Sequence, residues 1–399
     1  MSEWRNLPAG KIARQRREIV RLEPGIEYRT MGVRWYGKGA YDRGVVTTET
    51  VKAKSLYRAR KGDFTFNRID TDKGAFDVVS AELDGALATN EFPLYEVDKE
   101  EMDARFLLFY FQQPEVLRQI GAVRAGSEGR ARWKEADFEA WIVPVPPLPV
   151  QERIVEVVGA VDSQIAALDR ELEAAVRMRD GLLDELTGAD NCGTTPLGHL
   201  CTAIGSGPSW AAKDESSSPA EGSRTVLKIT NTRPDGTIDL SELAYVAGLP
   251  DRTKVIGPTS LIMIRTNGNR ARIGNVYLPS DELHGAAVSA FQFTLDATDV
   301  ETRDYLYLVL RSPRIQHKMS ESASGSTGLG NLAVRWLKTL EVPWPDVESR
   351  KAQIEMVQAV DANIAATRTE VGVLRDVRTA LLSGLLDRTI DIQSAELGV

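Results

Sequence analysis

Cysteine and histidine side chains are the residues of this 399-residue chain that could bind a metal or act as nucleophile and base. Eight residues separate Cys192 from Cys201, and the three histidines are scattered at His199, His284 and His317. Zinc-finger spacing is therefore absent, and two cysteines imply no disulfide framework. No Ser/His/Asp grouping for nucleophilic catalysis is indicated, so we expect these histidines to have core or surface roles.

A near-match to a phosphate-binding loop lies at residues 32–39, with the sequence GVRWYGKG. The pattern G-x-x-x-x-G-K-[ST] needs a hydroxyl at its last position to coordinate magnesium, and Gly39 stands there. No strong helical pattern follows. The chain also lacks the N-P-P-F or D-P-P-Y segment and the glycine motif of adenine methyltransferases. We therefore expect no nucleotide hydrolysis and no catalytic constellation.

Two glycine-bearing loops, GSEG at 126–129 and GSTG at 325–328, each precede a helical segment. Their backbone N–H groups could hold a phosphate at a helix start. A turn with helix capping explains the same residues equally well. Arg130 and Arg132 favour the phosphate interpretation for the first loop alone.

Composition describes a globular protein with an uneven charge distribution. Hydrophobic residues make up 42%, charged residues 27%, and the formal net charge is -8. Residues 1–68 nevertheless hold 16 Lys and Arg against 7 Asp and Glu, so the net value hides a basic segment. No run approaches the roughly 20 apolar residues of a membrane span, and no apolar core of a secretory signal is present. These features predict a cytoplasmic protein without a membrane partner.

An internal repeat organises the chain. An offset of 199 aligns residues 126–186 with 325–385 without a gap, and 19 of the 61 pairs are identical. Ordinary composition would give roughly four identities by chance. The best-matched stretch pairs VVGAVDSQIAA at 157–167 with MVQAVDANIAA at 356–366. The repeat is domain-sized, which indicates a duplicated architecture.

Each copy contains apolar residues at heptad spacing, which predicts a long helix after a proline-rich segment. In the first copy they run from Ile154 to Leu186, and in the second from Val357 to Leu385. Both patterns break at one shared position, Arg179 and Arg378, and Thr367 further weakens the second apolar seam. The predicted parts are a first domain (1–147), a central helix (148–190), a second domain (191–345), a distal helix (346–388) and a tail (389–399).

The two large domains have a mixed α/β pattern, so the predicted fold class is α+β. Short strand-like runs at 61–66 and 259–268 are bounded by turn residues, whereas 104–113 and 303–312 are typical of short buried helices. At roughly 150 residues per domain the length allows two or three such domains.

The duplicated helices suggest an antiparallel pair within one chain. A helix of roughly 36 residues is about 54 Å long, which equals about 16 base pairs at ~3.4 Å each. Such a pair would hold two binding domains a fixed distance apart. A dimerisation coiled coil between chains remains an alternative, although the internal duplication already supplies both strands.

The run VPVPPLPVQERIV at 143–155, followed by a helix that ends in a Leu-Leu pair, resembles the conserved region of type I restriction-modification specificity subunits. In the first domain, YRTMGVRWYGKG from Tyr28, KGDFTFNR from Lys61 and GAFDVV from Gly74 resemble one variant of that family's target recognition domain. In the second, IRTNGNRARIGNVYLP from Ile264 resembles another. The resemblance spans nearly the whole chain. The second proline segment, PWPD at 343–346, departs from the family pattern.

The resemblance implies a non-catalytic subunit that reads a split, asymmetric sequence in double-stranded DNA. Two DNA adenine methyltransferase subunits would dock on the conserved helices and bring S-adenosylmethionine. Restriction subunits that use ATP with magnesium for translocation could join them. This chain itself would carry no cofactor and no metal.

The resemblance further implies Arg, Lys and Asn side chains that face DNA, because these residues bond phosphates, guanine or adenine edges. Solvated surface charge explains any single one of these residues equally well, and only their clustering favours contact. The candidates are Arg34, Tyr36, Lys38, Lys54, Arg58, Lys61, Arg68 and Arg130 in the first domain, and Arg265, Asn267, Asn269, Arg270 and Arg272 in the second.

Two other functions stay open from the sequence. The helices could scaffold other proteins without DNA, or the chain could be a restriction-modification enzyme with its own nuclease activity. DNA binding that weakens steeply with salt would argue against the first. Cleavage by the isolated chain with a divalent metal would support the second.

Overall fold

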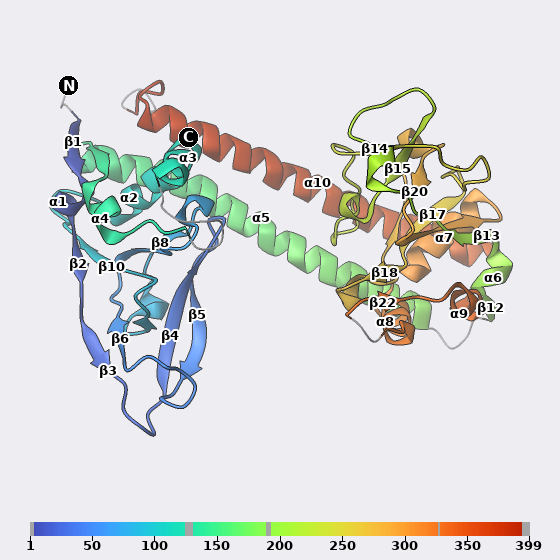
Figure 1. Cartoon of the computed structure of the whole chain (residues 1–399), viewed down its shortest axis with the longest axis horizontal. Coiled ribbons are helices and arrows are strands. Elements are labelled where there is room, and N and C mark those ends of the chain that lie inside the picture. The colour runs from blue at the N-terminus through green and yellow to red at the C-terminus, as the bar shows by residue number, and fades with distance from the viewer. Residues whose placement is uncertain (1–3, 124–130, 189–192, 326–327, 393–399) are drawn as a thin grey trace. The chain divides into compact units, whose positions relative to one another are not determined.

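The computed structural model describes residues 4–123, 131–188, 193–325 and 328–392 (Figure 1). The chain divides into two compact units. Unit 1 comprises residues 1–168 and 370–399, and unit 2 comprises residues 169–369. Each unit contains one β-rich domain and one half of each of the two long helices, α5 (Leu148–Gly188) and α10 (Val347–Leu386). The predicted mixed α+β fold with two long helices is confirmed.

The domain of unit 1 is built on a four-stranded antiparallel sheet with the order β2-β10-β7-β8. Its core is unusually aromatic: Phe64, Phe66 and Phe138 are fully buried and pack ring against ring at 5.5 Å. The strands are β2 (Ala13–Arg16), β7 (Phe64–Phe66), β8 (Phe76–Val78) and β10 (Leu94–Val97). The helices are α1 (Ala9–Ile12), α2 (Ala104–Phe111), α3 (Pro114–Val123) and α4 (Glu135–Ala140). A ribbon of β1 (Arg5–Pro8) and β11 (Ile142–Val145) leads into α5.

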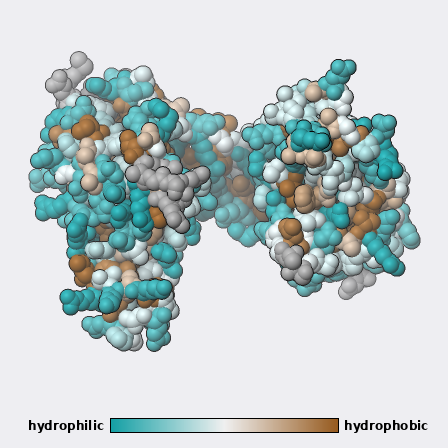
Figure 2. All heavy atoms as spheres, in the orientation of Figure 1, coloured by the Kyte–Doolittle hydropathy of each residue, from teal (hydrophilic) through white to brown (hydrophobic). Residues whose placement is uncertain are grey.

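A second sheet of unit 1 has five strands in the order β3-β6-β9-β4-β5. One face packs a small apolar cluster that includes Met31, Val33 and Leu83, whereas residues 42–45 on the edge strand β5 are exposed. Its strands are β3 (Ile19–Arg21), β4 (Tyr28–Arg34), β5 (Gly39–Val46), β6 (Ser55–Arg58) and β9 (Leu87–Ala88). Figure 2 shows mostly hydrophilic side chains over this part of the visible surface.

The domain of unit 2 repeats the first sheet of unit 1 strand for strand, in the order β13-β21-β17-β19. Its strands are β13 (Cys201–Ser206), β17 (Ser260–Ile264), β19 (Val276–Tyr277) and β21 (Gln292–Ala297). The helices are α6 (Leu197–Leu200), α7 (Val300–Leu310), α8 (Pro313–Ser322) and α9 (Val334–Thr339). A ribbon of β12 (Thr194–Pro196) and β23 (Glu341–Pro343) leads into α10. The short elements expected at 104–113, 259–268 and 303–312 are present as α2, β17 and α7.

The second sheet is where the two domains differ. In unit 2 it has four strands in the order β14-β16-β15-β20, and a separate ribbon joins β18 to β22. The parallel pairing of β15 with β20 matches that of β4 with β9 in unit 1, but the flanking strands do not correspond. The strands are β14 (Glu215–Ser216), β15 (Ser223–Leu227), β16 (Ala244–Ala247), β18 (Thr266–Asn267), β20 (Ala287–Val288) and β22 (Gly330–Asn331).

The two long helices pack antiparallel within each unit. In unit 1, Val158 of α5 shares an apolar cluster with Leu382 of α10, and Ile165 shares another with Val371. In unit 2, Leu183 of α5 lies in a cluster with Val357 of α10. Early α5 residues thus meet late α10 residues and the reverse. Each fully buried Leu, Ile or Val contributes roughly 1.5–3 kcal/mol, so these seams stabilise the pairing.

Candidate nucleic-acid interface

The predicted basic cluster of unit 2 lies on the loop that joins β17 to β19. Arg265 leaves the buried strand β17, donates from Nη1 to the carbonyl of Ala290 at 3.3 Å, and lies over the ring of Phe293 at 5.6 Å. The guanidinium is therefore held against the sheet. The loop is tied down further because Leu332 N–H donates to the carbonyl of Arg265 at 2.9 Å.

The two asparagines of this loop shape its backbone. Oδ1 of Asn267 accepts the N–H of Asn269 at 2.8 Å, and Oδ1 of Asn269 accepts the N–H of Ala271 at 3.1 Å. Asn269 is thereby the N-cap of the short 3-10 turn η5 (Arg270–Arg272). One lone pair of each amide oxygen is thus used locally, while a bidentate adenine contact needs both ends of an amide.

Arg270 and Arg272 point into different surroundings. Arg270 is exposed, whereas Arg272 is half-buried and donates from Nη2 to the carbonyl of Thr232 at 2.5 Å. The hydroxyl of Tyr277 donates to the carbonyl of Arg233 at 2.9 Å. These bonds join the loop after β17 to the segment after β15, and they bring the exposed Arg233 to the same region.

In unit 1, as in unit 2, hydrogen bonds join two loops that are distant in sequence, but the side chains on the loops differ. The turn between β4 and β5 carries Arg34, Tyr36 and Lys38, all exposed. Its backbone bonds the loop between β7 and β8, since Tyr36 N–H donates to the carbonyl of Lys73 at 2.6 Å and Gly37 N–H to that of Gly74 at 3.1 Å. Tyr36 is 70% exposed and adopts φ 61, a left-handed conformation that few non-glycine residues adopt.

Arg68 lies on that second loop, but its charge is engaged. Its Nη1 donates to the carbonyl of Asn90 at 3.2 Å and lies 3.5 Å from the carboxylate of Glu135. The arginine lines a hollow of about 210 Å³ with Arg17 and Tyr57. The guanidinium of Arg34 instead stacks on the ring of Tyr41 at 4.0 Å.

The remaining predicted residues of the first domain lie along β6 and its flanks. Lys54 precedes the strand and is exposed, and Lys61 is exposed in the turn that follows it. Arg58 on β6 pairs with Glu18 at 3.0 Å. Arg130 and the loop at 126–129 lie outside the described residues, as do Ser326 and Thr327 of the second glycine loop.

The structure therefore defines one composite surface in each domain, which we call the paired-loop surface. In unit 1 it consists of residues 34–38 and 67–74, and in unit 2 of residues 232–239 and 265–275. Sequence reasoning missed Lys73 and Arg233 because neither lies in a basic run. The Pro234-Asp235-Gly236 turn signal was the available hint that the chain reverses there.

Within the residues that the structure describes, no set of three or more His, Cys, Asp and Glu is placed to hold a metal ion. Burial raises the pKa of the Cys201 thiol to about 12, which suppresses its thiolate form at neutral pH. Among the described helices, none combines the length and apolar character that a membrane crossing needs.

No protein-family model matches this sequence, and no curated protein sequence matches it. Solved structures do match. The S subunit of the type I restriction-modification system from M. genitalium has a TM-score of 0.54 at 14% identity, over 96% of both chains. A chain from a structure on complex assembly and conformational transition of the type I R-M system has a TM-score of 0.57 at 16% identity, over 96% of this chain and 97% of that one. The chain therefore has the fold of these proteins along nearly its whole length.

Proposed function

We propose that this chain is the non-catalytic DNA sequence-specificity subunit of a type I restriction-modification complex. The observation that carries the proposal is the fold match, over 96% of this chain, to a type I S subunit and to a chain from a type I R-M assembly at TM-scores above one half. The internal duplication supports it independently, because two similar domains are what a two-part asymmetric target requires. Each domain reads one half of the target through its paired-loop surface.

The supporting chemistry is local to the two paired-loop surfaces. Exposed Arg270 in unit 2, and Arg34 and Lys38 in unit 1, present guanidinium and ammonium groups to solvent, whereas the exposed Arg233 is paired with Asp239. Such groups neutralise phosphates and bond guanine edges. The loops beneath them are held by backbone hydrogen bonds, so the cations are presented from a rigid base.

Catalysis belongs to partners in this proposal. Two DNA adenine methyltransferase subunits dock on the long helices and bring S-adenosylmethionine, and restriction subunits that use ATP with magnesium can join in the cytoplasm. Methylation of adenine requires the base to leave the stack, so this subunit holds the duplex on both sides of it. The long helices, each of 40 or 41 residues, fix the length of the unread gap between the half-sites.

The decisive experiment is single-molecule sequencing of DNA from cells that express this chain with its cognate methyltransferase. The control cells express the methyltransferase alone. A new methyladenine pattern in a split, asymmetric motif is the expected result and gives both half-sites at once. No new pattern, with both proteins present and associated, rejects the proposal and leaves a scaffold role for the helices.

A second experiment tests the gap-setting role. One heptad is inserted in α5 and one in α10 at matched positions of the repeat, and the motif is sequenced again. We expect both half-sites to be kept and the gap between them to change. A heptad in α5 alone should disrupt the seam and abolish methylation. An unchanged gap in a folded matched variant would rule the role out.

A further inference from the structure

Two arginines interrupt the apolar heptads of the long helices at the same position of the repeat. Arg179 of α5 and Arg378 of α10 are 199 residues apart. Two aspartates, Asp162 and Asp361, have the same separation. A charged residue in a helix seam costs stability unless it is paired, so the partners of these four side chains are informative.

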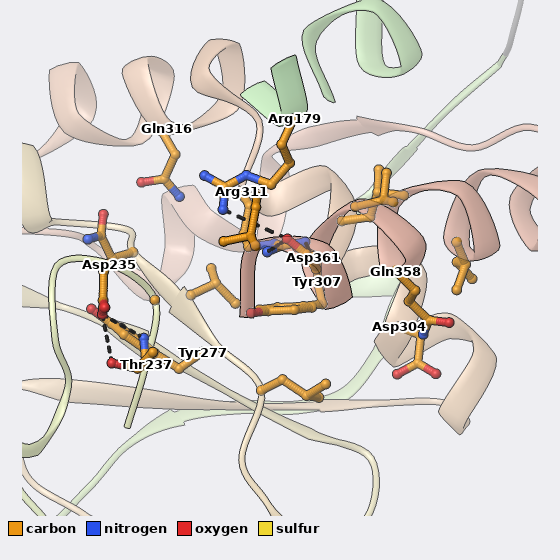
Figure 3. A pocket seen from close by; sticks show the side chains of 18 of the residues that line it. Arg179, Asp235, Thr237, Tyr277, Asp304, Tyr307, Arg311, Gln316, Gln358 and Asp361 are labelled. Carbon is orange, nitrogen blue, oxygen red and sulfur yellow. Dashed lines mark hydrogen bonds and ion pairs between the residues drawn. The ribbon is translucent and has the colours of Figure 1, made fainter. Parts of the chain in front are cut away.

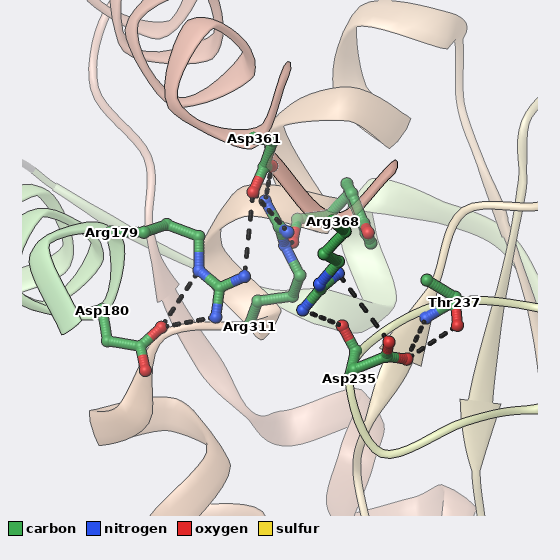
Figure 4. Close-up of polar contacts among 8 residues, drawn as sticks. Arg179, Asp180, Asp235, Thr237, Arg311, Asp361 and Arg368 are labelled. Carbon is green, nitrogen blue, oxygen red and sulfur yellow. Dashed lines mark hydrogen bonds and ion pairs between the residues drawn. The ribbon is translucent and has the colours of Figure 1, made fainter. Parts of the chain in front are cut away.

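In unit 2, Arg179 and Asp361 form one network with Asp180 and Arg311 (Figure 4). Arg179 of α5 lies 3.8 Å from the carboxylate of Asp361 on α10 and 2.7 Å from that of Asp180. Arg311, the C-cap residue of α7, donates to both oxygens of Asp361, at 2.6 and 3.3 Å. The side chain of Arg311 is only 14% exposed. Asp361 therefore joins both helices to the domain.

Unit 1 contains the corresponding network. Arg378 of α10 donates from Nε and Nη2 to the two oxygens of Asp162 on α5, with the Nη2 bond at 3.1 Å. The same Nη2 donates to Oε1 of Gln112 at 2.9 Å. Gln112 is the C-cap residue of α2 and precedes Arg311 by the repeat offset of 199. Each unit thus joins α5, α10 and the domain at equivalent residues.

The surroundings of the two networks also correspond. The network of unit 2 opens into a groove of about 420 Å³ that the turn at 234–237 borders (Figure 3). Arg368 of α10 reaches that turn, lying 3.9 Å from the carboxylate of Asp235 and donating to its carbonyl at 3.4 Å. The network of unit 1 opens into a groove of about 860 Å³ that Tyr36 and Gly37 border. In both units the groove lies beside the paired-loop surface.

We propose that these networks, Asp162 with Arg378 and Gln112, and Asp361 with Arg179 and Arg311, are mounts that fix where each recognition domain is seated on the helix pair. If α10 slipped by one heptad along α5, apolar residues would still meet apolar residues, because Leu, Ile and Val can replace one another in the seam. Apolar contacts alone therefore select the register only weakly. A paired Arg and Asp exist at one position only and select one register. Gln112 in unit 1 and Arg311 in unit 2 then connect the helix register to the domain.

The inference rests on the proposed function, since a half-site is read in phase with its neighbour only if the reading domain is held in one orientation. The six side chains are positioning residues, and none needs to contact DNA. The mount of unit 1 has an additional property. Gln112 carries both a donor and an acceptor, so its amide can serve an arginine or an aspartate on α10.

The test uses the full chain with its two native cysteines replaced by alanine. Nitroxide labels are placed at two exposed positions of unit 1, Ala122→Cys on α3 and Val373→Cys on α10. The distance distribution between the labels is measured by pulsed electron resonance. Charge reversal by Arg378→Asp or by Asp162→Arg should broaden or shift this distribution, with a shift of about 10 Å for a one-heptad slip.

The double exchange of Arg378→Asp with Asp162→Arg should restore the original distribution, because Gln112 can reverse its amide. Arg170→Asp, a charge reversal at an exposed position of α5, is the matched control and should leave the distribution unchanged. Single variants that keep the original distribution would overturn the proposal. An exchange that fails to restore it would also do so, whether that variant is folded or not.

This readout needs no DNA, so it separates the two proposals. A wild-type chain that directs no methylation but responds to charge reversal and exchange has the mount without the proposed function. A chain that directs bipartite methylation but tolerates both single reversals has the function without the mount.

Discussion

Arg270 and Arg272 show how two identical side chains two residues apart take different roles. Arg270 projects into solvent, while Arg272 bonds the carbonyl of Thr232 and joins two loops. A guanidinium in solvent is available to phosphate or base edges. One that satisfies a partly buried carbonyl is already used for the fold.

We therefore expect replacement of Arg270 by alanine to affect DNA binding and replacement of Arg272 by alanine to affect folding stability. Arg270→Ala should weaken DNA binding and reduce the slope of log affinity against log salt by about 1, with the unfolding midpoint unchanged. Arg272→Ala should lower the free energy of unfolding by about 1–3 kcal/mol, because it leaves the Thr232 carbonyl without its charged donor. Filter binding at several salt concentrations and urea unfolding of both variants measure the two effects.

Asp251→Ala, in an exposed turn of the same unit, serves as the neutral control for both assays. An Arg270 variant that loses stability, or an Arg272 variant that loses salt-dependent binding at full stability, would contradict this division of roles.

Residue type and local clustering predicted which loop of unit 2 is basic, but not which of its side chains are free. Arg265 and Arg272 are half-buried because the loop folds back on β21 and on the segment after β15, which are distant in sequence. Nothing within the run 264–275 encodes those neighbours. Lys73 and Arg233 lie outside any basic run, and only the folding of distant segments brings them to these loops.

At the start of each long helix, one polar side chain at the same position of the repeat bonds the helix to its proline segment and to the domain. Gln151 of α5 is fully buried, and its amide accepts the N–H of Asp103 at 2.8 Å while donating to the carbonyls of Glu101 and Pro146. At the equivalent position of α10, Arg350 donates to the carbonyl of Pro345 at 2.8 Å and to Glu301 at 3.2 Å. Each side chain fastens a helix start to its proline segment and to the domain.

We expect Gln151→Leu to destabilise unit 1 strongly. Leucine has a similar volume but leaves three backbone groups without partners, at about 1–3 kcal/mol each. Urea unfolding should show a loss of at least about 3 kcal/mol, whereas Glu152→Leu at the exposed neighbouring position should stay close to the wild type. A Gln151→Leu variant within 1 kcal/mol of the wild type would show that water or rearrangement supplies those bonds.

The N-terminus of α7 contributes to the folding stability of unit 2 in a way that depends on pH. Asp299 is its N-cap, and the backbone N–H of Thr302 at 2.8 Å lowers the pKa of the Asp299 carboxyl below its ordinary 3.8. A lowered pKa in the folded state means that the contribution is complete above pH 3.8 and is lost as pH falls through the lowered value. Asp299→Asn keeps the cap but does not titrate.

The stability of wild type relative to Asp299→Asn should therefore decline as the pH falls below about 4, as chemical unfolding at several pH values would measure. Asp299→Ala should cost about 1 kcal/mol at neutral pH through loss of the cap. A constant difference between the wild type and Asp299→Asn over that range would refute the assignment.

Elements with strong periodicity were predictable, and elements defined by pairing were not. The heptads of α5 and α10, the apolar run of β17 and the aromatic helix α2 carry their own signals. The second sheets have strands of two to eight residues whose partners are distant, and their flanking strands differ between the domains. The repeat also offered no guide there, because the recognisable match begins only at residue 126. Thr367, which the sequence predicts to weaken the seam, is buried, and its hydroxyl donates to the carbonyl of Asn363; the strength of the seam stays a prediction.

At the scale of the whole molecule, each half of the chain contains a complete set of complementary parts. Residues 1–190 include the apolar residues Ile154, Val158 and Ile165, and also one aspartate and one arginine of the mounts, Asp162 and Arg179, which the repeat relates to Asp361 and Arg378. Truncation after residue 190 removes α10 and leaves those apolar residues uncovered. We expect two copies of the truncated chain to pair through α5 as a symmetric substitute for the missing helix.

Light scattering after size exclusion should give twice the monomer mass for the truncated chain over a wide concentration range. Val158→Glu in the truncated chain should shift it toward monomer, because a carboxylate would then lie in the seam. The same analysis of Glu156→Gln at an exposed position controls for surface changes. A truncated chain that stays monomeric and folded at high concentration would count against helix pairing.

Because unit 1 is built from two separate stretches of the chain, it can be completed only after the second domain has been synthesised. Its first segment ends at residue 168 and its second begins at residue 370, so all of the second domain is translated between them. At ~5–20 residues per second the ribosome needs about 10–40 s to cover that interval. During this time Val158 and Ile165 have left the ribosome, while Leu382 and Val371, which cover them, have not been made. We therefore expect slower translation of the second domain to prolong the exposure of these apolar residues.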